Sequence, residues 1–316
     1  MQANEGATGT AVGPGPGRAA ASRRRVGPYR VITALDDPRT KYPVPERRYI
    51  ARSTDGQHTV LLSLPHGGGD PQRFLAEAET SRFLLGPCAD PATALAAPDE
   101  PAWYARPYLP VLPLPTALAV HGGPLPERTV RTLGVALAET LAILHGQELT
   151  FAGVSPAAVL LAAEGPRLSC FGAVRAAAPD GTPRSGLPGL EAGSLPPEQA
   201  SGGRPRPLGD VYALGATLAY AATGHTTPER GELPAAFRAV ISRCLTRDPG
   251  ARPQLAELID ALADGNAAGS TTLLDPGWLP GRVIAALAHQ SAAVLRAEIP
   301  VETVPASITP ATPHSN

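Results

Sequence analysis

Asp210-Val211-Tyr212-Ala213-Leu214-Gly215 opens the stretch that decides the fold, and the chain stays almost wholly apolar from there to Ala222. A helix that is apolar on all sides is buried in a core. The stretch is well short of the ~20 apolar residues that a membrane-spanning helix needs. We therefore expect residues 210–222 to form a buried central helix with one carboxylate, Asp210, at its start.

The sequence around this helix predicts a helical C-terminal half. Apolar residues recur at helical spacing on both sides of it, and short β-rich pieces interrupt the pattern. The expected elements are a helix at 128–145, short strands at 159–161 and 167–169, a Gly/Pro/Ala-rich loop at 173–195, and helices at 233–245 and 254–263.

The N-terminal half is rich in strand-forming residues. A hairpin is expected where Tyr49–Ser53 and Thr59–Leu64 flank the turn at 54–57. The other expected elements are a strand at 26–32, a helix at 71–85 with Phe74 and Phe83 on one side, and a strand at 103–109. A strand-rich part followed by a helical part predicts an α+β fold.

Composition excludes several classes of function. Hydrophobic residues make up 43% and charged residues 17% of the chain, which is typical of a soluble globular protein. The net charge of −1 gives no support to binding of nucleic acid or of an anionic membrane. Cys88, Cys170 and Cys244 lack CxxC or His-linked spacing, so we expect reduced thiols. The first residues lack the apolar core of a signal peptide, and a cytoplasmic protein is expected.

Four strings carry a family resemblance: Val26-Gly27-Pro28-Tyr29-Arg30, Pro197-Glu198-Gln199-Ala200, Asp210–Gly215, and Arg243-Cys244-Leu245-Thr246-Arg247-Asp248-Pro249-Gly250-Ala251-Arg252-Pro253. In residues and in order they resemble the bacterial Ser/Thr protein kinases, especially those of actinobacteria. In that family they correspond to the first strand, the close of the activation segment, helix F and the final block. The resemblance implies that Glu198 pairs with Arg252. It also implies that Asp210 accepts backbone N–H bonds beneath the catalytic loop.

The resemblance covers about residues 26–262 and implies a bilobal, protein-kinase-like fold of the α+β class. The helix predicted towards the C-terminus has an apolar face that suits docking either on the helical lobe or on a partner. The expected divisions are a disordered arm at 1–25, a kinase-like domain at 26–262 (N-lobe 26–110, C-lobe 111–262), a linker at 263–275, a C-terminal helix at 276–298, and a disordered Pro/Thr-rich tail at 299–316.

The parts that hold phosphate in a kinase are a glycine-rich loop and a lysine on the third strand. The third-strand position is Ser63, and the chain has a single lysine, Lys41. The helix residue that would pair with the lysine corresponds best to Glu77, with Glu79 as second choice, and we expect it to lack a cation. The loop at 36–45 has no glycine and three prolines, so few N–H groups face phosphate. These prolines stiffen the loop and disfavour Lys41 as a substitute.

The parts that perform the chemistry are also altered. The catalytic-loop pattern falls on Phe151–Leu161, where Gly153 replaces the catalytic aspartate and Ala158 the metal-binding asparagine. Twelve residues later the D-F-G motif reads Cys170-Phe171-Gly172. The degenerate catalytic positions are Ser63, Gly153, Ala158 and Cys170, and the retained structural positions are Glu77, Phe171, Gly172, Pro197, Glu198, Asp210 and Arg252.

These losses within a kept frame predict a pseudokinase, a non-catalytic scaffold or allosteric regulator in a bacterial Ser/Thr phosphorylation or signalling pathway. The expected partner is a protein, such as an active kinase or its substrate, and no cofactor or metal is expected. Two alternatives stay open. One is a divergent ATP-dependent protein Ser/Thr kinase that binds phosphate through arginines and a metal through Asp36, Asp37 or Glu77. The other is a sensor that binds ATP without turnover.

Some single residues allow more than one interpretation. Cys170 is either a reactive thiol facing the cleft or a small residue that fills the former metal site, and we favour the second. Arg106, before the hinge-like Pro107-Tyr108-Leu109, closes the adenine pocket, pairs with Glu77, or extends to the surface. His145 is expected to be structural. The candidate phosphorylation sites, for which a merely solvating role is favoured, are Thr271, Thr272, Thr303, Ser307, Thr309 and Thr312.

Overall fold

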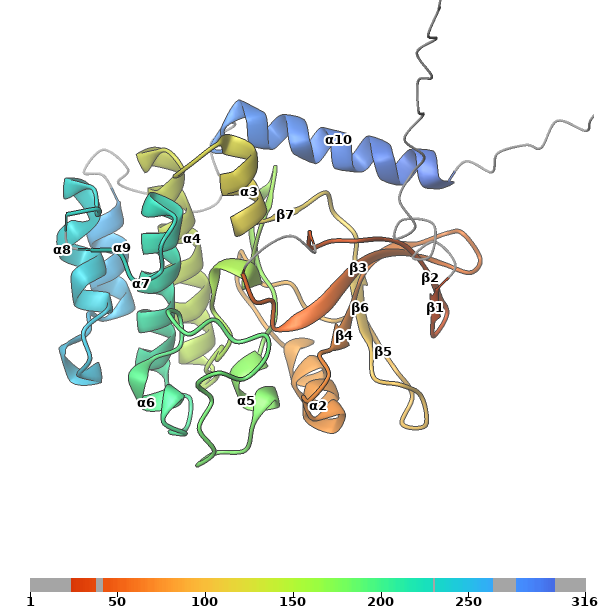
Figure 1. Ribbon diagram of the computed structural model, residues 1–316, viewed down its shortest axis with the longest axis horizontal. Coiled ribbons are helices and arrows are strands. Elements are labelled where there is room, and N and C mark those ends of the chain that lie inside the picture. Colours follow the sequence, from red (N-terminus) through yellow and green to blue (C-terminus); the bar gives the residue numbers. More distant parts are fainter. Residues whose placement is uncertain (1–23, 38–41, 230, 264–276, 299–316) are drawn as a thin grey trace, which may run out of the picture.

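The computed structural model describes residues 24–37, 42–229, 231–263 and 277–298. Within these ranges the chain forms a strand-rich lobe, a helical lobe, and a last helix that lies along both (Figure 1). The predicted α+β, bilobal, kinase-like fold is therefore confirmed. Lys41, the predicted linker and tail with their phosphorylation sites, and nearly all of the predicted arm lie outside the described residues, and the domain boundaries stay predictions.

The N-lobe is built on an antiparallel sheet with the order β1-β2-β3-β4-β6-β5. Its strands are β1 (Arg25–Val26), β2 (Tyr29–Ala34), β3 (Glu46–Ser53), β4 (Thr59–Pro65), β5 (Ala94–Leu95) and β6 (Tyr104–Pro107). The predicted hairpin is β3–β4, and its register pairs Arg52 with Thr59 and Arg48 with Ser63. Side chains paired across strands share a face, so this register decides which residues reach the site.

Helix α2 (Pro71–Ser81) packs Phe74 and Ala78 against Tyr104 of the sheet. The Asp70 carboxylate accepts the first free amides and Pro71 occupies the first turn, which is the expected start of a helix. The helix ends four residues earlier than predicted. Beyond it the chain turns so that Leu84 is buried, and Phe83 is 69% exposed rather than on the apolar side.

The helical lobe surrounds α7 (Pro207–Thr223), which is buried along nearly its whole length as predicted. Gly215 lets α7 approach the helix α8 (Ala235–Cys244) closely, because a Cβ there would meet the side chain of Cys244. The other elements are α3 (Leu114–His121), α4 (Glu127–Gly146), α5 (Ala173–Ala177), α6 (Pro197–Ala200), α8 (Ala235–Cys244), α9 (Leu255–Leu262), the strands β7 (Leu112–Pro113), β8 (Val159–Ala162) and β9 (Gly165–Leu168), and 3-10 turns at Pro156–Ala158 and Pro249–Ala251.

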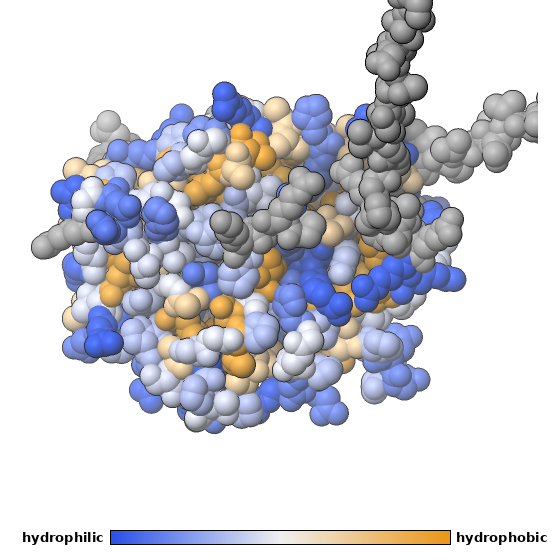
Figure 2. Space-filling model, viewed as in Figure 1, coloured by the Kyte–Doolittle hydropathy of each residue, from blue (hydrophilic) through white to orange (hydrophobic). Residues whose placement is uncertain are grey.

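Three helices depart from the prediction. Helix α3 was not expected, because its prolines and short length resemble a loop. The short α5 falls inside the predicted loop at 173–195. Helix α10 (Gly281–Glu298) begins later than the expected residue 276. Among the described helices none combines the length and apolar character needed to cross a membrane. On the face shown in Figure 2, apolar residues form several separate patches among hydrophilic ones.

The two lobes meet at an apolar cluster that lies between the N-lobe sheet and β8. Leu35, Ile50 and Leu61 come from the N-lobe side. Leu160 and Ala162 come from β8, Val111 from the connection between the lobes, and Val294 from α10. Every member of the cluster is less than a tenth exposed. Two of its members, Leu61 and Leu160, lie two residues from the degenerate positions Ser63 and Ala158.

Candidate functional site

Ser63 lies in a row of side chains that crosses the N-lobe sheet. It is paired with Arg48 on β3 and with Tyr104 on β6, so the three side chains point to one face. Ser63 is fully buried, and its hydroxyl donates to Glu46 Oε1 at 2.9 Å. The Tyr104 hydroxyl lies 2.8 Å from both Glu46 oxygens. Burial, with the charge of Glu46, raises the pKa of Tyr104 well above its ordinary value, so the phenol stays a donor.

Arg48 supplies a cation to the site that the sequence prediction described as having none. Its guanidinium is fully buried and its Nε donates to Asp36 Oδ2 at 2.9 Å, while Nη1 donates to Ser169 Oγ at 3.1 Å. Burial alone would lower the pKa of Arg48, but the charge and hydrogen bonds of Asp36 raise it, so the guanidinium stays charged. The cation near Ser63 is thus Arg48 of the neighbouring strand β3. It is already paired with the carboxylate of Asp36, which belongs to the degenerate phosphate loop.

Arg106 occupies the back of the same site. It is 1% exposed, with Nε 3.1 Å from Asp90 Oδ2 and Nη2 3.5 Å from Glu46 Oε1. Two of the three predicted roles are therefore wrong, because Arg106 neither pairs with Glu77 nor extends to the surface. Burial raises the pKa of Asp90, and Arg106 opposes that change. Arg106 lines a cavity of about 60 Å³ that lies between α2, β6 and the 168–173 segment. That volume suits a few water molecules.

Glu77 has a cationic partner, and the expectation that it lacks one is wrong. Arg175 of α5 donates from Nε to Glu77 Oε1 at 2.9 Å and from Nη2 to Oε2 at 2.7 Å. The same guanidinium donates to the Thr150 carbonyl at 2.8 Å and lies 4.9 Å from the centre of the Phe171 ring. Helix α2 is thereby tied to the segment that follows Cys170-Phe171-Gly172. Glu79, the second choice, forms an exposed pair with Arg82 instead.

The backbone of the catalytic loop is held as the resemblance implies. Asp210 accepts the amide of Phe151 at 2.7 Å and that of Ala152 at 2.9 Å, and His145 Nε2 lies 3.0 Å from Asp210 Oδ2. Ala152 and Cys170 have positive φ angles of 52° and 65°, values that non-glycine residues adopt rarely and mostly at functional sites. The residues 151–161 carry no carboxylate, carboxamide or ammonium side chain, while the backbone conformation of the loop is held in place.

Three of the degenerate positions are closely packed together. Ala158 is fully buried, and its carbonyl accepts the Ser169 hydroxyl at 2.7 Å. A Cβ on Gly153 would meet the carbonyl oxygen of Cys170. Cys170 is 2% exposed and burial raises the pKa of its thiol to about 12, so it has the properties of a space-filling residue. Among the residues that the structure describes, no three His, Cys, Asp or Glu side chains are grouped to hold a metal ion.

Glu198 and Arg252, from the activation-segment motif and the final block, form the ion pair that the resemblance implies. Arg252 donates from Nη1 to Glu198 Oε1 at 2.6 Å and from Nη2 to Oε2 at 2.9 Å. Its side chain is buried and also donates to the Leu208 carbonyl at the start of α7. Pro197 begins α6, which carries Glu198. This pair fixes the end of the 173–200 segment to the core of the helical lobe.

Comparison with known proteins identifies relatives of one kind. No protein-family model matches the chain. It is 31% identical over 266 residues to the probable serine/threonine-protein kinase PkwA of Thermomonospora curvata, covering 76% of this chain and 34% of that protein. It is 28% identical over 295 residues to the serine/threonine-protein kinase AfsK of Streptomyces coelicolor, covering 83% and 35%. The chain thus spans about a third of the length of these relatives.

A further similarity is confined to a shorter region. The serine/threonine-protein kinase PknK of Mycobacterium tuberculosis is 35% identical over 167 residues, which cover 45% of this chain and 15% of that protein. All of these relatives carry the name of the same enzyme class.

Proposed function

Because this chain is a homologue of the bacterial Ser/Thr protein kinases, we propose that it is a pseudokinase, which transfers no phosphoryl group and acts by binding a protein partner. The observation that carries the proposal is the site around Ser63, Gly153, Ala158 and Cys170. Its backbone is held by Asp210, yet none of these four positions offers a carboxylate, amide or ammonium group.

The requirements of phosphoryl transfer explain why this matters. The reaction depends on positioned cations around the transferred phosphate and on a carboxylate that orients the attacking hydroxyl. Arg48 is a cation beside Ser63, but two of its nitrogens already donate to the Asp36 carboxylate. Asp36 thus takes the place that the anionic phosphate would need. Binding phosphate there would require breaking a buried ion pair, which is costly.

Two other functions are tested against this one. A divergent protein Ser/Thr kinase is favoured by one observation, the buried Arg48 beside Ser63, which could serve phosphate if Asp36 moved away. Asp36 and Asp37 would then be the candidate metal ligands. The third function is a sensor that binds ATP without hydrolysing it. All three share the kinase-like fold and differ only in what the cleft binds and does.

The regulatory role is part of the same proposal. A kinase-like fold without phosphoryl transfer acts through its surface, and we propose an active kinase of a bacterial Ser/Thr phosphorylation pathway, or the substrate of such a kinase, as its partner. A cytoplasmic location is likewise proposed, because these relatives are named for a reaction that uses ATP.

The deciding experiment combines thermal unfolding with a transfer assay. The protein is unfolded with ATP, with and without Mg²⁺, and is incubated in parallel with ATP labelled on the γ-phosphate and a generic protein substrate. A ligand that binds only the folded state adds about 2.7 kcal/mol to stability at a hundredfold excess over its dissociation constant. We expect no transfer. A stability shift without transfer identifies the sensor, and transfer that is lost in Lys41→Ala or Asp36→Ala overturns the pseudokinase.

A further inference from the structure

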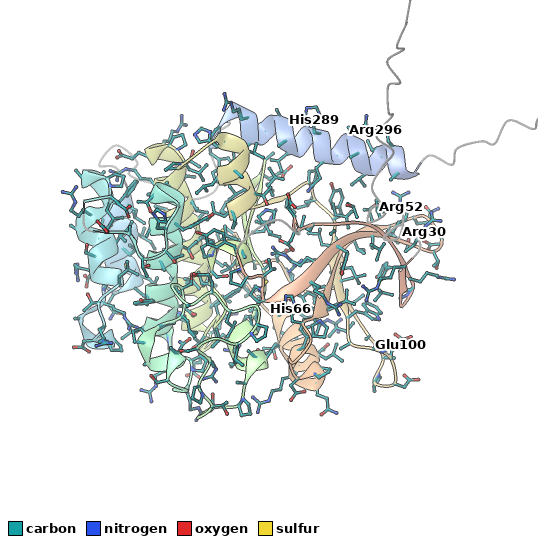
Figure 3. The ribbon with its side chains drawn as sticks, viewed as in Figure 1. Arg30, Arg52, His66, Glu100, His289 and Arg296 are labelled. Carbon is teal, nitrogen blue, oxygen red and sulfur yellow. The ribbon has the colours of Figure 1, made fainter. Side chains whose placement is uncertain are left out.

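Helix α10 presents one narrow buried stripe to the rest of the molecule. Val283, Leu287, Gln290 and Val294 follow one another at spacings of four, three and four residues, which places them on one side of a helix. The three apolar members are at most 4% exposed. His289 and Arg296 lie on the outer side (Figure 3). The helix is therefore docked along its length.

The start of α10 and the residues just before it are anchored to the helical lobe. Trp278 is 2% exposed, and its indole N–H donates to the Ala163 carbonyl at 3.1 Å. The Trp278 carbonyl accepts the hydroxyl of Thr129 from α4 at 2.8 Å. Leu279, Val283 and Leu287 continue this contact in the main core of the lobe. This end is built into the fold.

The second part reaches the other lobe. Figure 1 shows α10 running from α3 towards the part of the sheet that holds β2 and β3. Val294 joins the apolar cluster that contains Leu61 and Leu160. Leu61 lies two residues before Ser63 on β4, and Leu160 lies two residues after Ala158. The side chain of Val294 therefore packs in a buried cluster that includes residues close in the sequence to Ser63 and Ala158.

The side chain of Gln290 is hydrogen-bonded to the segment that connects the two lobes. Its Oε1 accepts the Val111 amide at 2.9 Å and the Tyr108 hydroxyl at 3.2 Å, and its Nε2 donates to the Val111 carbonyl at 2.8 Å. One carboxamide thus satisfies both the donor and the acceptor of a single residue. Val111 is 1% exposed, so removing Gln290 would leave buried polar groups unpaired.

We propose that α10 is a lid on the interlobe cleft, hinged on the helical lobe at Trp278 and fastened at its far end by Gln290 and Val294. With the lid fastened, the apolar walls of the cleft are covered and the peptide groups of Val111 are occupied. With it unfastened, the cleft takes a planar aromatic ring that carries a hydrogen-bond donor beside an acceptor. Such a ring matches both the apolar walls and the pair of groups that Gln290 releases. The proposal holds whether or not the protein transfers phosphate.

The test uses variants of the whole chain that remove a contact holding α10 in place. Each is compared with a control variant at the adjacent, exposed residue. Val294→Asp puts a charge on the buried stripe, and Leu295→Asp puts the same charge on the next residue, which is 60% exposed. Gln290→Ala removes the carboxamide, and His289→Ala truncates the exposed residue before it. If Val294→Asp does not unfold cooperatively, Val294→Ala takes its place.

Each variant is measured in two ways. Hydrogen exchange followed by mass spectrometry reports opening of the segments 108–111 and 281–298. Fluorescence titration with mant-adenosine, without Mg²⁺, reports entry of a planar heterocycle into the cleft. The apparent dissociation constant scales inversely with the open fraction, and minor states of this kind are typically about 0.1–10% populated.

We expect Val294→Asp and Gln290→Ala to speed exchange in both segments and to lower the apparent dissociation constant by about tenfold or more. Leu295→Asp and His289→Ala should match the wild type. Faster exchange without tighter binding would show that α10 does not guard a ligand site and would overturn the proposal. Unchanged exchange, or equal effects in the matched controls, would show that Gln290 and Val294 do not fasten the helix, which also overturns it. Phosphoryl transfer is read in a separate assay, so its outcome does not affect this one.

Discussion

At the scale of single residues, Arg48 is the side chain that gives the site a cation although the third-strand lysine is replaced by Ser63. It lies directly across from Ser63, its charge is met by Asp36, and Nη1 reaches Ser169 of the segment before Cys170. One guanidinium therefore joins the N-lobe sheet, the former phosphate loop and the former metal site. The preceding residue, Arg47, donates a hydrogen bond from its Nε to the Pro65 carbonyl and is less deeply buried than Arg48.

Arg48→Met should destabilise the protein by about 3–5 kcal/mol, because it leaves the Asp36 carboxylate without its buried partner. Arg47→Met, the matched control, should cost about 0.5 kcal/mol or less. Adding Asp36→Asn to Arg48→Met should recover part of the loss, since the unpaired charge is then gone. Denaturant unfolding measures all of these free energies. Equal losses for the two arginine variants would contradict the assignment of a buried pair.

At the scale of elements, the tie between α2 and α5 is made by Glu77 and Arg175. Their side chains are 18% and 27% exposed, which is a partly desolvated pair with two parallel hydrogen bonds. On α2 the Glu79–Arg82 pair is about half exposed at both ends. The same helix thus carries an internal comparison between a pair that links two elements and a pair that links only neighbours.

A double-mutant cycle on Glu77→Ala and Arg175→Ala should give a coupling energy of about 1 kcal/mol or more, because the pair is bidentate and partly buried. The cycle on Glu79→Ala and Arg82→Ala should give about 0–0.5 kcal/mol, as for exposed pairs. Hydrogen exchange of α2 should rise only in the first set. Equal coupling in both cycles would mean that α2 is held by the packing of Phe74 and Ala78 alone.

The sequence predicted these elements better than it predicted their contacts. Hydrophobic periodicity placed α4, α7 and the β3–β4 hairpin, because each has a clear apolar pattern. The partner of Ser63 was also within reach, since counting back from the turn at 54–57 pairs it with Arg48. Arg175 was not, because it lies in a stretch without periodicity. The docking of α10 was left open for a similar reason. Its apolar stripe fits more than one surface, and the Gln290 contact to Val111 carries no local pattern.

At the scale of the whole molecule, the described contacts hold the lobes together in several places. Arg48 to Ser169, Glu77 to Arg175 and Gln290 to Val111 each join parts that are far apart in sequence. In an active kinase such contacts would compete with the motions that admit and release nucleotide. A molecule closed in this way suits a function that presents a fixed surface, which is the property the pseudokinase proposal requires.

Global stability should fall at alkaline pH, and the three buried cysteines contribute to that fall. All of the cysteine thiols are buried, and burial raises the pKa of Cys88 to about 11 and those of Cys170 and Cys244 to about 12. Unfolded thiols have their ordinary pKa of about 9.0, so above that pH the folded state binds more protons than the unfolded state. The free energy of unfolding must then fall as pH rises. Lysine adds little, because the chain has only Lys41. Burial also raises the pKa of Tyr29, Tyr42, Tyr104, Tyr212 and Tyr220, so these phenols lower the free energy of unfolding further as the pH approaches 10.

Each thiol costs about 1.4 kcal/mol per pH unit above its unfolded pKa, and pH 10 lies one unit above 9.0. The three thiols together should therefore make the protein less stable at pH 10 than at pH 8 by about 4 kcal/mol. Denaturant unfolding at both pH values measures the difference. Replacing Cys88, Cys170 and Cys244 by alanine, one at a time, should each reduce that difference by about 1.4 kcal/mol. Iodoacetamide in the native state should label Cys170 no faster than the other two, since all three thiols stay protonated and inaccessible. The opposite result has two parts: rapid labelling of Cys170 alone, and a pH dependence of the free energy of unfolding that Cys170→Ala leaves unchanged. Together they would show that Cys170 is an exposed, reactive thiol at the former metal position.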